Sequence, residues 1–310
     1  MSRIVYIGVD GGGTKTSLCA ADSGGRIFSA CEGFGMNYNF VGVKKAAADF
    51  LETVGKLSLT EECKIAGIAI GDPSVDDLVP SPMTEEFVAC VKTGLHLETQ
   101  CPVYLKSDAF MALYGMTGGA PGALMISGTG SMGIAVDRRG AIHITGGWGR
   151  LTEDEGSGYY IAVNGIKAAL RCYDGTGPET VLLEKFRKYF GTDNPRKFIA
   201  AYYAGCGSFP EIFGFSKEVG DAAENDREAE KIVHACADIL IAGMGALLKK
   251  ADLSQCTAGI YGSVLLHNTQ IRNRFKEGIL KKYPDVKIEV PSVKPEMAAL
   301  KYMFDRERKR

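Results

Sequence analysis

The segment at residues 4–14, IVYIGVDGGGT, joins a short apolar run to a glycine-rich turn. A second apolar run follows the turn, so the glycines are predicted to connect two strands. Residues 122–136, GALMISGTGSMGIAV, have the same order of strand, glycine turn and strand. In both regions a polar turn and a third apolar run come next, which indicates an internal duplication.

Both turns have the chemistry of an anion site. Glycine lacks a Cβ, so backbone N–H groups can approach a phosphate closely, and Thr14 and Thr129 each add a hydroxyl donor. Glycine doublets also form ordinary hairpin turns, and either turn alone is open to that interpretation. The matched pair favours two turns from two domains that hold one polyphosphate.

Two better-known glycine motifs fit less well. Gly8 and Gly13 have the P-loop spacing, but Thr14 precedes Lys15 and strand-like residues follow in place of a helix. Residues 128–133 match the dinucleotide-binding pattern, yet another strand and turn follow there too. Neither motif predicts the function.

Alternating strands and helices predict an α/β protein of two duplicated domains. In the first domain a helix at 43–57 and a strand at 65–70 follow the three strands. In the second domain, helices are predicted at 159–171, 178–190, 195–204, 226–249 and 270–281, with a strand at 258–261. The two predicted domains are 1–115 and 116–294, and the second contains a helical insertion. A C-terminal helix at 295–310 is predicted to pack back on the first domain.

Composition excludes several functional classes. The net charge of −1 provides no basic face for nucleic acid, and the charged residues 306–310 are typical of a solvated tail. The apolar run at 4–9 is too short to span a membrane or to form a secretory signal, so we expect a cytoplasmic protein. The nine cysteines form no C-x-x-C pair and the four histidines are dispersed, which disfavours disulfides and a transition-metal site.

Five motifs in this order resemble those of the BadF/BadG-type ATPase family, which includes eukaryotic N-acetylglucosamine kinase, within the superfamily of actin, heat-shock chaperones and sugar kinases. The motifs are residues 10–14, 33–37, 107–109, 127–131 and 146–157. The resemblance implies two ribonuclease-H-like domains, each with a βββαβα core, and a cleft between them for ATP and sugar. It implies an ATP- and Mg²⁺-dependent kinase for a small amino sugar, such as N-acetylglucosamine, glucosamine or N-acetylmuramic acid, and it allows a homodimer.

The resemblance implies that two sets of residues bind ATP. Asp10 would orient Mg²⁺ through water, although an aspartate in a glycine turn can also be a plain turn former. Lys15 would neutralise phosphate charge, or it is simply solvated. The complete set is Asp10, Gly12, Gly13, Thr14, Lys15, Gly128, Thr129 and Gly130 for phosphate, and Gly262 and Ser263 for adenosine.

Asp108 is the implied catalytic base, which takes a proton from the sugar hydroxyl. It follows a short strand, and either Ser107 or Asp108 could cap the next helix. From the residues alone, capping is the better interpretation of Asp108. The resemblance favours catalysis instead.

The implied sugar contacts include Asn37, whose amide can donate and accept, although a left-handed turn residue is an equal alternative. Trp148 lies among glycines and acidic residues, where a ligand loop competes with a core tryptophan. Met132 stands where the human-type kinase has asparagine, which leaves the sugar open. The complete sugar set is Asn37, Asp108, Ser131, Gly147, Trp148, Asp154 and Gly158.

Two other functions remain to be weighed. An activator ATPase of 2-hydroxyacyl-CoA dehydratases would share the phosphate turns, but it needs closely placed loop cysteines for an iron–sulfur cluster. Cys172, Cys206 and Cys236 lack that setting. A non-catalytic sugar sensor would have no need of Asp10, Thr14, Thr129 and Asp108 together. Likeness of fold alone does not separate these functions.

Overall fold

The computed structural model describes residues 3–150, 152–204 and 210–308, and it places the chain in two units. Unit 1 comprises Met1–Pro121, Arg138–Ile142 and Pro291–Arg310. Unit 2 comprises Gly122–Asp137 and His143–Val290. Each unit contains one five-stranded mixed sheet with helices, so the α/β fold with duplicated domains is confirmed.

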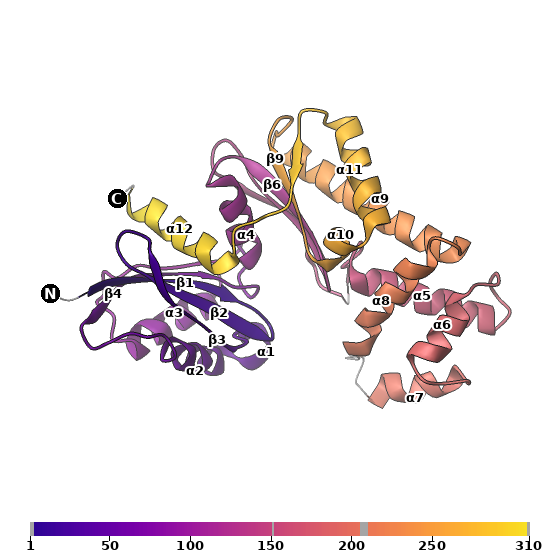
Figure 1. The fold of residues 1–310 in the computed structure, drawn as a ribbon, viewed down its shortest axis with the longest axis horizontal. Coiled ribbons are helices and arrows are strands. Elements are labelled where there is room, and N and C mark those ends of the chain that lie inside the picture. Colours follow the sequence, from indigo (N-terminus) through magenta and orange to yellow (C-terminus); the bar gives the residue numbers. More distant parts are fainter. Residues whose placement is uncertain (1–2, 151, 205–209, 309–310) are drawn as a thin grey trace. The chain divides into compact units, whose positions relative to one another are not determined.

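In unit 1 the sheet has the order β3-β2-β1-β4-β5 (Figure 1). Strands β1 (Arg3–Gly11), β2 (Lys15–Ala21) and β3 (Ile27–Phe34) are antiparallel neighbours. Strands β4 (Cys63–Gly71) and β5 (Val103–Lys106) run parallel to β1. Because β1, β4 and β5 are parallel, the residues after their carboxyl ends emerge at one edge of the sheet.

Two helical layers cover the sheet of unit 1 (Figure 1). Helix α1 (Tyr38–Val41) precedes α2 (Val43–Val54), which packs against α3 (Pro82–Gly94) and against β3. Helices α4 (Asp108–Thr117) and α12 (Pro295–Glu307) pack together, and α12 lies along β1 and β4. Apolar side chains under α2 and α3 form one core, with Ile7, Phe50 and Phe87 fully buried.

The close approach of α12 to β1 explains Gly8. A Cβ atom at this position would lie 2.1 Å from the carbonyl oxygen of Glu296 in the first turn of α12. Ala298 faces Gly115 of α4, where an added Cβ would lie 2.7 Å from the Ala298 Cβ. The glycine that completes the apparent P-loop spacing is therefore a packing residue for the C-terminal helix.

The sheet of unit 2 has the order β10-β9-β6-β7-β8, which repeats the plan of unit 1. Its first three strands are β6 (Gly122–Ser127), β7 (Ser131–Val136) and β8 (Ile142–Gly146). Strands β9 (Thr257–Tyr261) and β10 (Lys287–Glu289) are parallel to β6. The antiparallel pair of β6 and β7 carries the second glycine turn, as β1 and β2 carry the first.

A helical group is inserted between β8 and β9 (Figure 1). It includes α5, α6, α7 and α8, and also α9, which packs on β6 and β7 and against α11. Its buried apolar side chains join those of the sheet in one core. The bounds are α5 (Gly158–Tyr173), α6 (Leu182–Tyr189), α7 (Arg196–Ala204), α8 (Pro210–Ala222) and α9 (Arg227–Lys250), and between β9 and β10 α10 (Ser263–His267) and α11 (Thr269–Lys282).

Helix α8 is not among the helices that the sequence predicts. It contains Gly214 and Gly220, which weaken helix propensity. Packing on α5 stabilises the helix instead. Gly165 of α5 lets Val219 approach so closely that a Cβ at position 165 would lie 2.2 Å from the Val219 side chain. Tertiary contacts therefore override local preference here.

Helix α9 is long and apolar enough to cross a membrane by length and composition. Its side chains at Val233, Leu240, Met244 and Leu247 are buried in the core of unit 2. A core helix of a water-soluble domain meets the same criteria as a membrane span, and this burial accounts for its apolar face.

Candidate active site

The first glycine turn, residues 12–14, is supported by the two residues that follow β3. The Met36 N–H donates to the Gly12 carbonyl at 3.1 Å. A Cβ at Gly35 would lie 2.3 Å from the Gly13 carbonyl oxygen, so only glycine fits there. In the described part of the chain, no hydrogen bond engages the N–H groups of Gly12, Gly13 or Thr14. The turn therefore presents three backbone donors in a fixed shape.

Three carboxylates gather at the carboxyl edge of the parallel strands. Asp10 lies in β1 and pairs in register with Gly71 of β4, which in turn pairs with Lys106 of β5. Asp72 follows β4 directly. After β5 comes Ser107, and the next residue, Asp108, begins α4. The fold of unit 1 alone thus brings together Asp10 and Asp108, two of the predicted site residues.

Burial raises the pKa of these carboxylates first, and neighbouring negative charge adds to it. For Asp10, burial and then the charges of Asp108, Glu296 and, least, Asp72 raise the pKa to about 7, while Lys15 lowers it. Burial, and to a lesser extent the charge of Asp108, raises the pKa of Asp72 to about 6. This edge therefore carries more negative charge than its own cations balance, and a bound cation would relieve the repulsion.

Asp72 is a site residue that the sequence analysis did not identify. Its side chain is fully buried, and its Oδ1 accepts from the Ser74 N–H at 2.7 Å. Its Oδ2 is buried and has no hydrogen-bond partner among the described residues. A Cβ at Gly11 would lie 2.6 Å from this oxygen, so Asp72 packs against the backbone next to Asp10. A glycine-aspartate-proline break after a strand gives no motif that could have marked it.

The question of which residue caps α4 is resolved in favour of Ser107. The Ser107 Oγ accepts from the Phe110 N–H at 2.9 Å. Asp108 is the first helical residue, half-buried, and its Oδ1 accepts from the Ala109 N–H at 2.7 Å. Burial raises the pKa of Asp108, which makes its carboxylate a stronger proton acceptor.

Asn37 does not have the left-handed backbone of the alternative interpretation. Its φ is −63°, and its side chain caps α1 by accepting from the Asn39 N–H at 3.1 Å. The neighbouring Asn39 donates its side-chain amide to the Ser74 carbonyl at 3.3 Å, and the Tyr38 hydroxyl bonds to Thr84 at 2.9 Å. These bonds tie the Asn37 segment to the loop that follows β4 and to α3.

Lys15 is engaged on the surface of unit 1. Its Nζ lies 2.7 Å from Glu32 Oε1, and both side chains are exposed. An exposed ion pair of this kind is weak because water screens it, so the ammonium can exchange partners at little cost. Solvation and phosphate neutralisation are both compatible with this geometry.

The second glycine turn differs from the first in how its backbone is used. The Gly128 N–H donates to the Gly130 carbonyl at 2.9 Å, and the Gly128 carbonyl accepts from the Gly158 N–H at 2.7 Å. The expectation that Gly128 donates to phosphate is therefore not met in this conformation. The N–H groups of Thr129 and Gly130 have no partner within residues that the structure describes, and these two remain as donors.

The segment at 154–158 is joined to this turn by side chains. The Ser127 hydroxyl donates to the Gly156 carbonyl at 2.6 Å, and the Ser131 hydroxyl donates to the Glu155 carbonyl at 2.6 Å. Asp154 accepts from the Ser131 N–H at 3.1 Å, and burial raises its pKa. Asp154, Ser131, Gly130 and Gly158, which the sequence predicted as ligand contacts, thus lie together in unit 2.

Trp148 is exposed to 79%, which excludes the core interpretation. It lies in a loop between Gly147 and Gly149, both with positive φ, and Thr152 donates to its carbonyl at 2.8 Å. Gly147 donates its N–H to the Ser131 carbonyl at 3.0 Å, and a Cβ there would lie 3.2 Å from the Met132 Cβ. The loop that carries the tryptophan is therefore anchored beside the second glycine turn.

Gly262 packs against the same turn. Its φ is 89°, and a Cβ would lie 2.4 Å from the Ser127 carbonyl oxygen. Ser263, the other implied adenosine contact, begins the short helix α10 directly after it. Gly262 thus brings the end of β9 against the glycine turn that follows its parallel neighbour β6.

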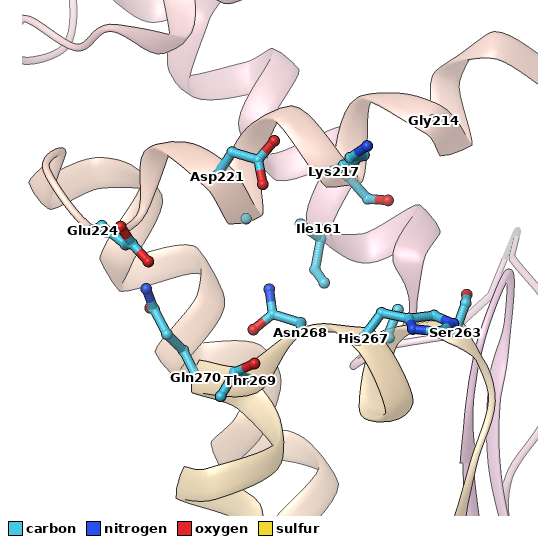
Figure 2. Close-up of a pocket in the computed structure, with 13 residues that line it drawn as sticks. Ile161, Gly214, Lys217, Asp221, Glu224, Ser263, His267, Asn268, Thr269 and Gln270 are labelled. Atoms are coloured by element: carbon cyan, nitrogen blue, oxygen red, sulfur yellow. The ribbon is translucent and has the colours of Figure 1, made fainter.

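A cavity of about 670 Å³ opens in unit 2 beside Ser263 (Figure 2). Asp221 and Glu224 project into it from α8 and the residues after it, and Asn268, Thr269 and Gln270 face them from the start of α11 (Figure 2). Gly220 lets Asn268 approach, since a Cβ at 220 would lie 2.9 Å from its amide nitrogen. The wall of the cavity also includes Ile161, Lys217, Val264 and His267. Of these residues only Ser263 was expected from the sequence; those of α8 were missed because that helix was not predicted, and the others because no motif marks them.

Among the residues described here, no three or more His, Cys, Asp or Glu side chains are placed to bind one metal ion together, so the carboxylates of unit 1 do not form a complete metal site by themselves. The eight cysteines described are all free thiols. Cys206 lies outside the described residues. Cys172 and Cys236 lie within α5 and α9, so neither is in a loop.

Comparisons with known proteins show what the chain is similar to. The chain is 34% identical over 207 residues to N-acetyl-D-glucosamine kinase of Dictyostelium discoideum, an alignment that covers 60% of this chain and 62% of that protein. It is 27% identical over 290 residues to N-acetylmuramic acid/N-acetylglucosamine kinase of Clostridium acetobutylicum, with 91% of this chain and 92% of that protein covered.

Two solved structures share the fold. One is a protein of Chromobacterium violaceum provisionally described as N-acetylglucosamine kinase, with a TM-score of 0.76, 22% identity and coverage of 97% of this chain and 99% of that one. The other is a ROK family glucokinase of Streptomyces griseus, with a TM-score of 0.57, 18% identity and coverage of 99% and 100%. The family model for BadF/BadG/BcrA/BcrD ATPases matches residues 7–300, and the chain therefore belongs to the BadF/BadG/BcrA/BcrD ATPase family.

Proposed function

We propose that this protein is an ATP-dependent kinase that transfers the γ-phosphoryl group to a hydroxyl of an amino sugar. The observation that carries the proposal is the position of Asp108, at the start of α4 and at the same sheet edge as the Asp10 turn. Phosphoryl transfer needs mainly positioning and charge neutralisation, and one carboxylate within reach of the acceptor hydroxyl suffices as base. The names of the curated relatives support this class of reaction.

Phosphate binding is assigned to the unpaired backbone donors of the two glycine turns. In unit 1 these are Gly12, Gly13 and Thr14, and in unit 2 they are Thr129 and Gly130. Gly128 shapes its turn by an internal hydrogen bond. Lys15 adds positive charge once it releases Glu32.

The acidic edge of unit 1 fits Mg²⁺. Asp10 supplies an oxygen ligand of the kind that Mg²⁺ prefers, directly or through water, and its pKa is raised first by burial and then by neighbouring carboxylates. When bound, Mg²⁺ would neutralise phosphate charge. Asp10 would hold it, and the buried Asp72 adds negative potential behind Asp10.

Asp108 would accept the proton of the sugar hydroxyl as that oxygen attacks the γ-phosphorus. Its Oδ1 is held by the Ala109 N–H, which fixes the direction of the carboxylate. Burial raises its pKa, which brings a carboxylate closer to the operating pH of a general base.

Sugar binding is assigned to Asn37 and Asp108 in unit 1 and to a set in unit 2. In unit 2 these are two polar residues, two glycines and the exposed Trp148. The set is Ser131, Gly147, Trp148, Asp154 and Gly158. Because the Ser131 hydroxyl hydrogen already bonds to the Glu155 carbonyl, its oxygen is left to accept from the sugar. Met132, beside Gly147, replaces a polar residue of the human-type kinase and would influence which amino sugar fits.

The cavity of unit 2 is assigned to the adenosine part of ATP. Its volume of about 670 Å³ is in the range of small-molecule sites. Asp221 and Glu224 can accept hydrogen bonds from ribose hydroxyls, and Ser263 lies at its wall. We further place the enzyme in the cytoplasm, where ATP and reduced thiols are available.

A coupled assay for ADP release tests the proposal with a panel of N-acetylglucosamine, glucosamine, N-acetylmuramic acid and glucose. We expect at least one amino sugar to raise ADP release well above the sugar-free rate. If no sugar raises it, the kinase function is wrong.

A further inference from the structure

Asp77 is a buried carboxylate outside every sequence motif. It lies in the loop between β4 and α3, and its side chain is 0% exposed. The adjacent Asp76 is exposed and only caps the loop, by accepting from the Leu78 and Val79 N–H groups. A charge removed from water is costly unless it is paired, so the contacts of Asp77 require an explanation.

The partners of Asp77 are the two residues before Asp108. Its Oδ2 accepts from the Ser107 hydroxyl at 2.5 Å, and its Oδ1 accepts from the Ser107 N–H at 3.4 Å. The Lys106 Nζ lies 3.4 Å from Oδ1 and balances the charge. Asp77 therefore binds both hydrogen atoms that Ser107 can donate.

This arrangement determines how Ser107 caps α4. Because the hydroxyl hydrogen of Ser107 points to Asp77, its lone pair is free to accept from the Phe110 N–H at 2.9 Å. That bond closes the first turn of the helix, which Asp108 begins. A chain of hydrogen bonds thus runs from the Asp77 loop through Ser107 to the turn that carries Asp108.

We propose that Asp77 is a positioning residue, which holds Ser107 and through it sets the direction of the Asp108 carboxylate. The inference rests on the proposed function, since it presumes that Asp108 acts as the base. The charge of Asp77 also contributes to the raised pKa of Asp108, after burial. Asp77 touches none of the reacting groups in this assignment.

The test compares Asp77→Asn, Asp77→Ala, Ser107→Ala and Ser107→Thr with the matched control Asp76→Asn. Each variant is measured for kcat, for KM of ATP and of the sugar, for ADP affinity by calorimetry, and for thermal unfolding. We expect Asp77→Ala and Ser107→Ala to lose on the order of 10- to 100-fold in kcat, the scale that a small misplacement of a catalytic group causes. KM for ATP and ADP affinity should stay within about twofold, because the glycine turns are intact.

Two variants separate positioning from general loss of structure. Ser107→Thr keeps the hydroxyl and should recover kcat to within about threefold of wild type, since threonine also serves as an N-cap. The double variant Asp77→Ala/Ser107→Ala should be no slower than the slower single variant, because both act through one chain of bonds. Asp76→Asn should behave as wild type.

Hydrogen exchange gives a readout that does not depend on turnover. The Phe110 amide should exchange faster in Asp77→Asn and Asp77→Ala than in wild type, and at the wild-type rate in Asp76→Asn. Unchanged kcat in Asp77→Asn, or a loss of kcat accompanied by an equal loss of ADP affinity, would overturn the inference. An inactive wild type would overturn the proposed function instead, and the exchange rates would still decide whether Asp77 holds Ser107.

Discussion

The two glycine turns have the same sequence plan but differ in their hydrogen bonds and in the residues around them. In unit 1 the turn keeps three free N–H donors and stands beside the carboxylates Asp10 and Asp108. In unit 2 the Gly128 N–H is used inside the turn, and the turn is bonded to the segment at 154–158, whose Asp154 carboxylate accepts from the Ser131 N–H. The same framework therefore carries open backbone donors beside carboxylates in one copy and a turn closed by internal hydrogen bonds in the other.

The largest expected effect concerns the acidic edge of unit 1. Asp108→Asn should lower kcat by about 10²- to 10⁴-fold, the range for a general base, because the amide cannot accept the hydroxyl proton. ADP affinity should be unchanged in calorimetry, because Asp108 is not among the phosphate donors. Asp193→Asn, an exposed position in unit 2, is the control. Wild-type turnover in Asp108→Asn would remove the base assignment.

The second glycine turn is tested by Gly262→Ala, which places a Cβ 2.4 Å from the Ser127 carbonyl oxygen at a φ of 89°. Urea unfolding should show a loss of about 3 kcal/mol, from overpacking and backbone strain together. Gly140→Ala has a similar φ of 82° but open space around the new Cβ, so it should lose only about 1 kcal/mol. Equal losses in the two variants would mean that Gly262 is needed for its conformation alone.

The buried Asp72 predicts an unusual dependence of stability on pH. Because its folded pKa of about 6 lies above the ordinary 3.8, its contribution to stability is complete below about pH 4 and is lost as pH rises through 6. Asp72→Asn, which keeps the acceptor for the Ser74 N–H, should be more stable than wild type at pH 8 by about 3 kcal/mol. The gain should vanish near pH 4 in thermal unfolding, and a gain that is independent of pH would contradict this account.

The smallest effect is expected in the cavity of unit 2. Asp221→Ala should raise KM for ATP by about 3- to 10-fold, the loss of one hydrogen bond, with kcat unchanged. Glu230→Ala, an exposed acidic residue on α9, should leave KM unchanged. An unaltered KM for ATP in Asp221→Ala would exclude this carboxylate from nucleotide binding.

The duplicated strands and glycine turns were predictable because apolar runs and glycines act locally. Asp108 was singled out by the resemblance to a known family, since the residues around it alone favoured a helix cap. Asp72 and Asp77 were not predictable, since their importance depends on pairing between β1, β4 and β5 and on a loop that folds back to Ser107. Helix α8, with its Asp221, was not predicted because its glycines lower helix propensity, and the helix is stabilised by packing on α5.

Some questions that the sequence leaves open are decided only by three-dimensional contacts, which no sequence pattern specifies. A serine followed by an aspartate offers two equivalent caps in sequence, and only the Phe110 N–H shows that Ser107 is the cap. Trp148 could have been a core residue until its exposure was known. The use of the Gly128 N–H within its own turn likewise depends on backbone geometry that a glycine motif does not specify.

The most direct measurement of the central claim is phosphorus NMR of wild-type protein incubated with ATP, Mg²⁺ and each sugar of the panel, with Asp108→Asn in parallel. The account predicts a new phosphomonoester signal that requires an amino sugar and is absent with the variant over the same time. Release of inorganic phosphate alone, or an equal phosphomonoester signal with Asp108→Asn, would contradict it.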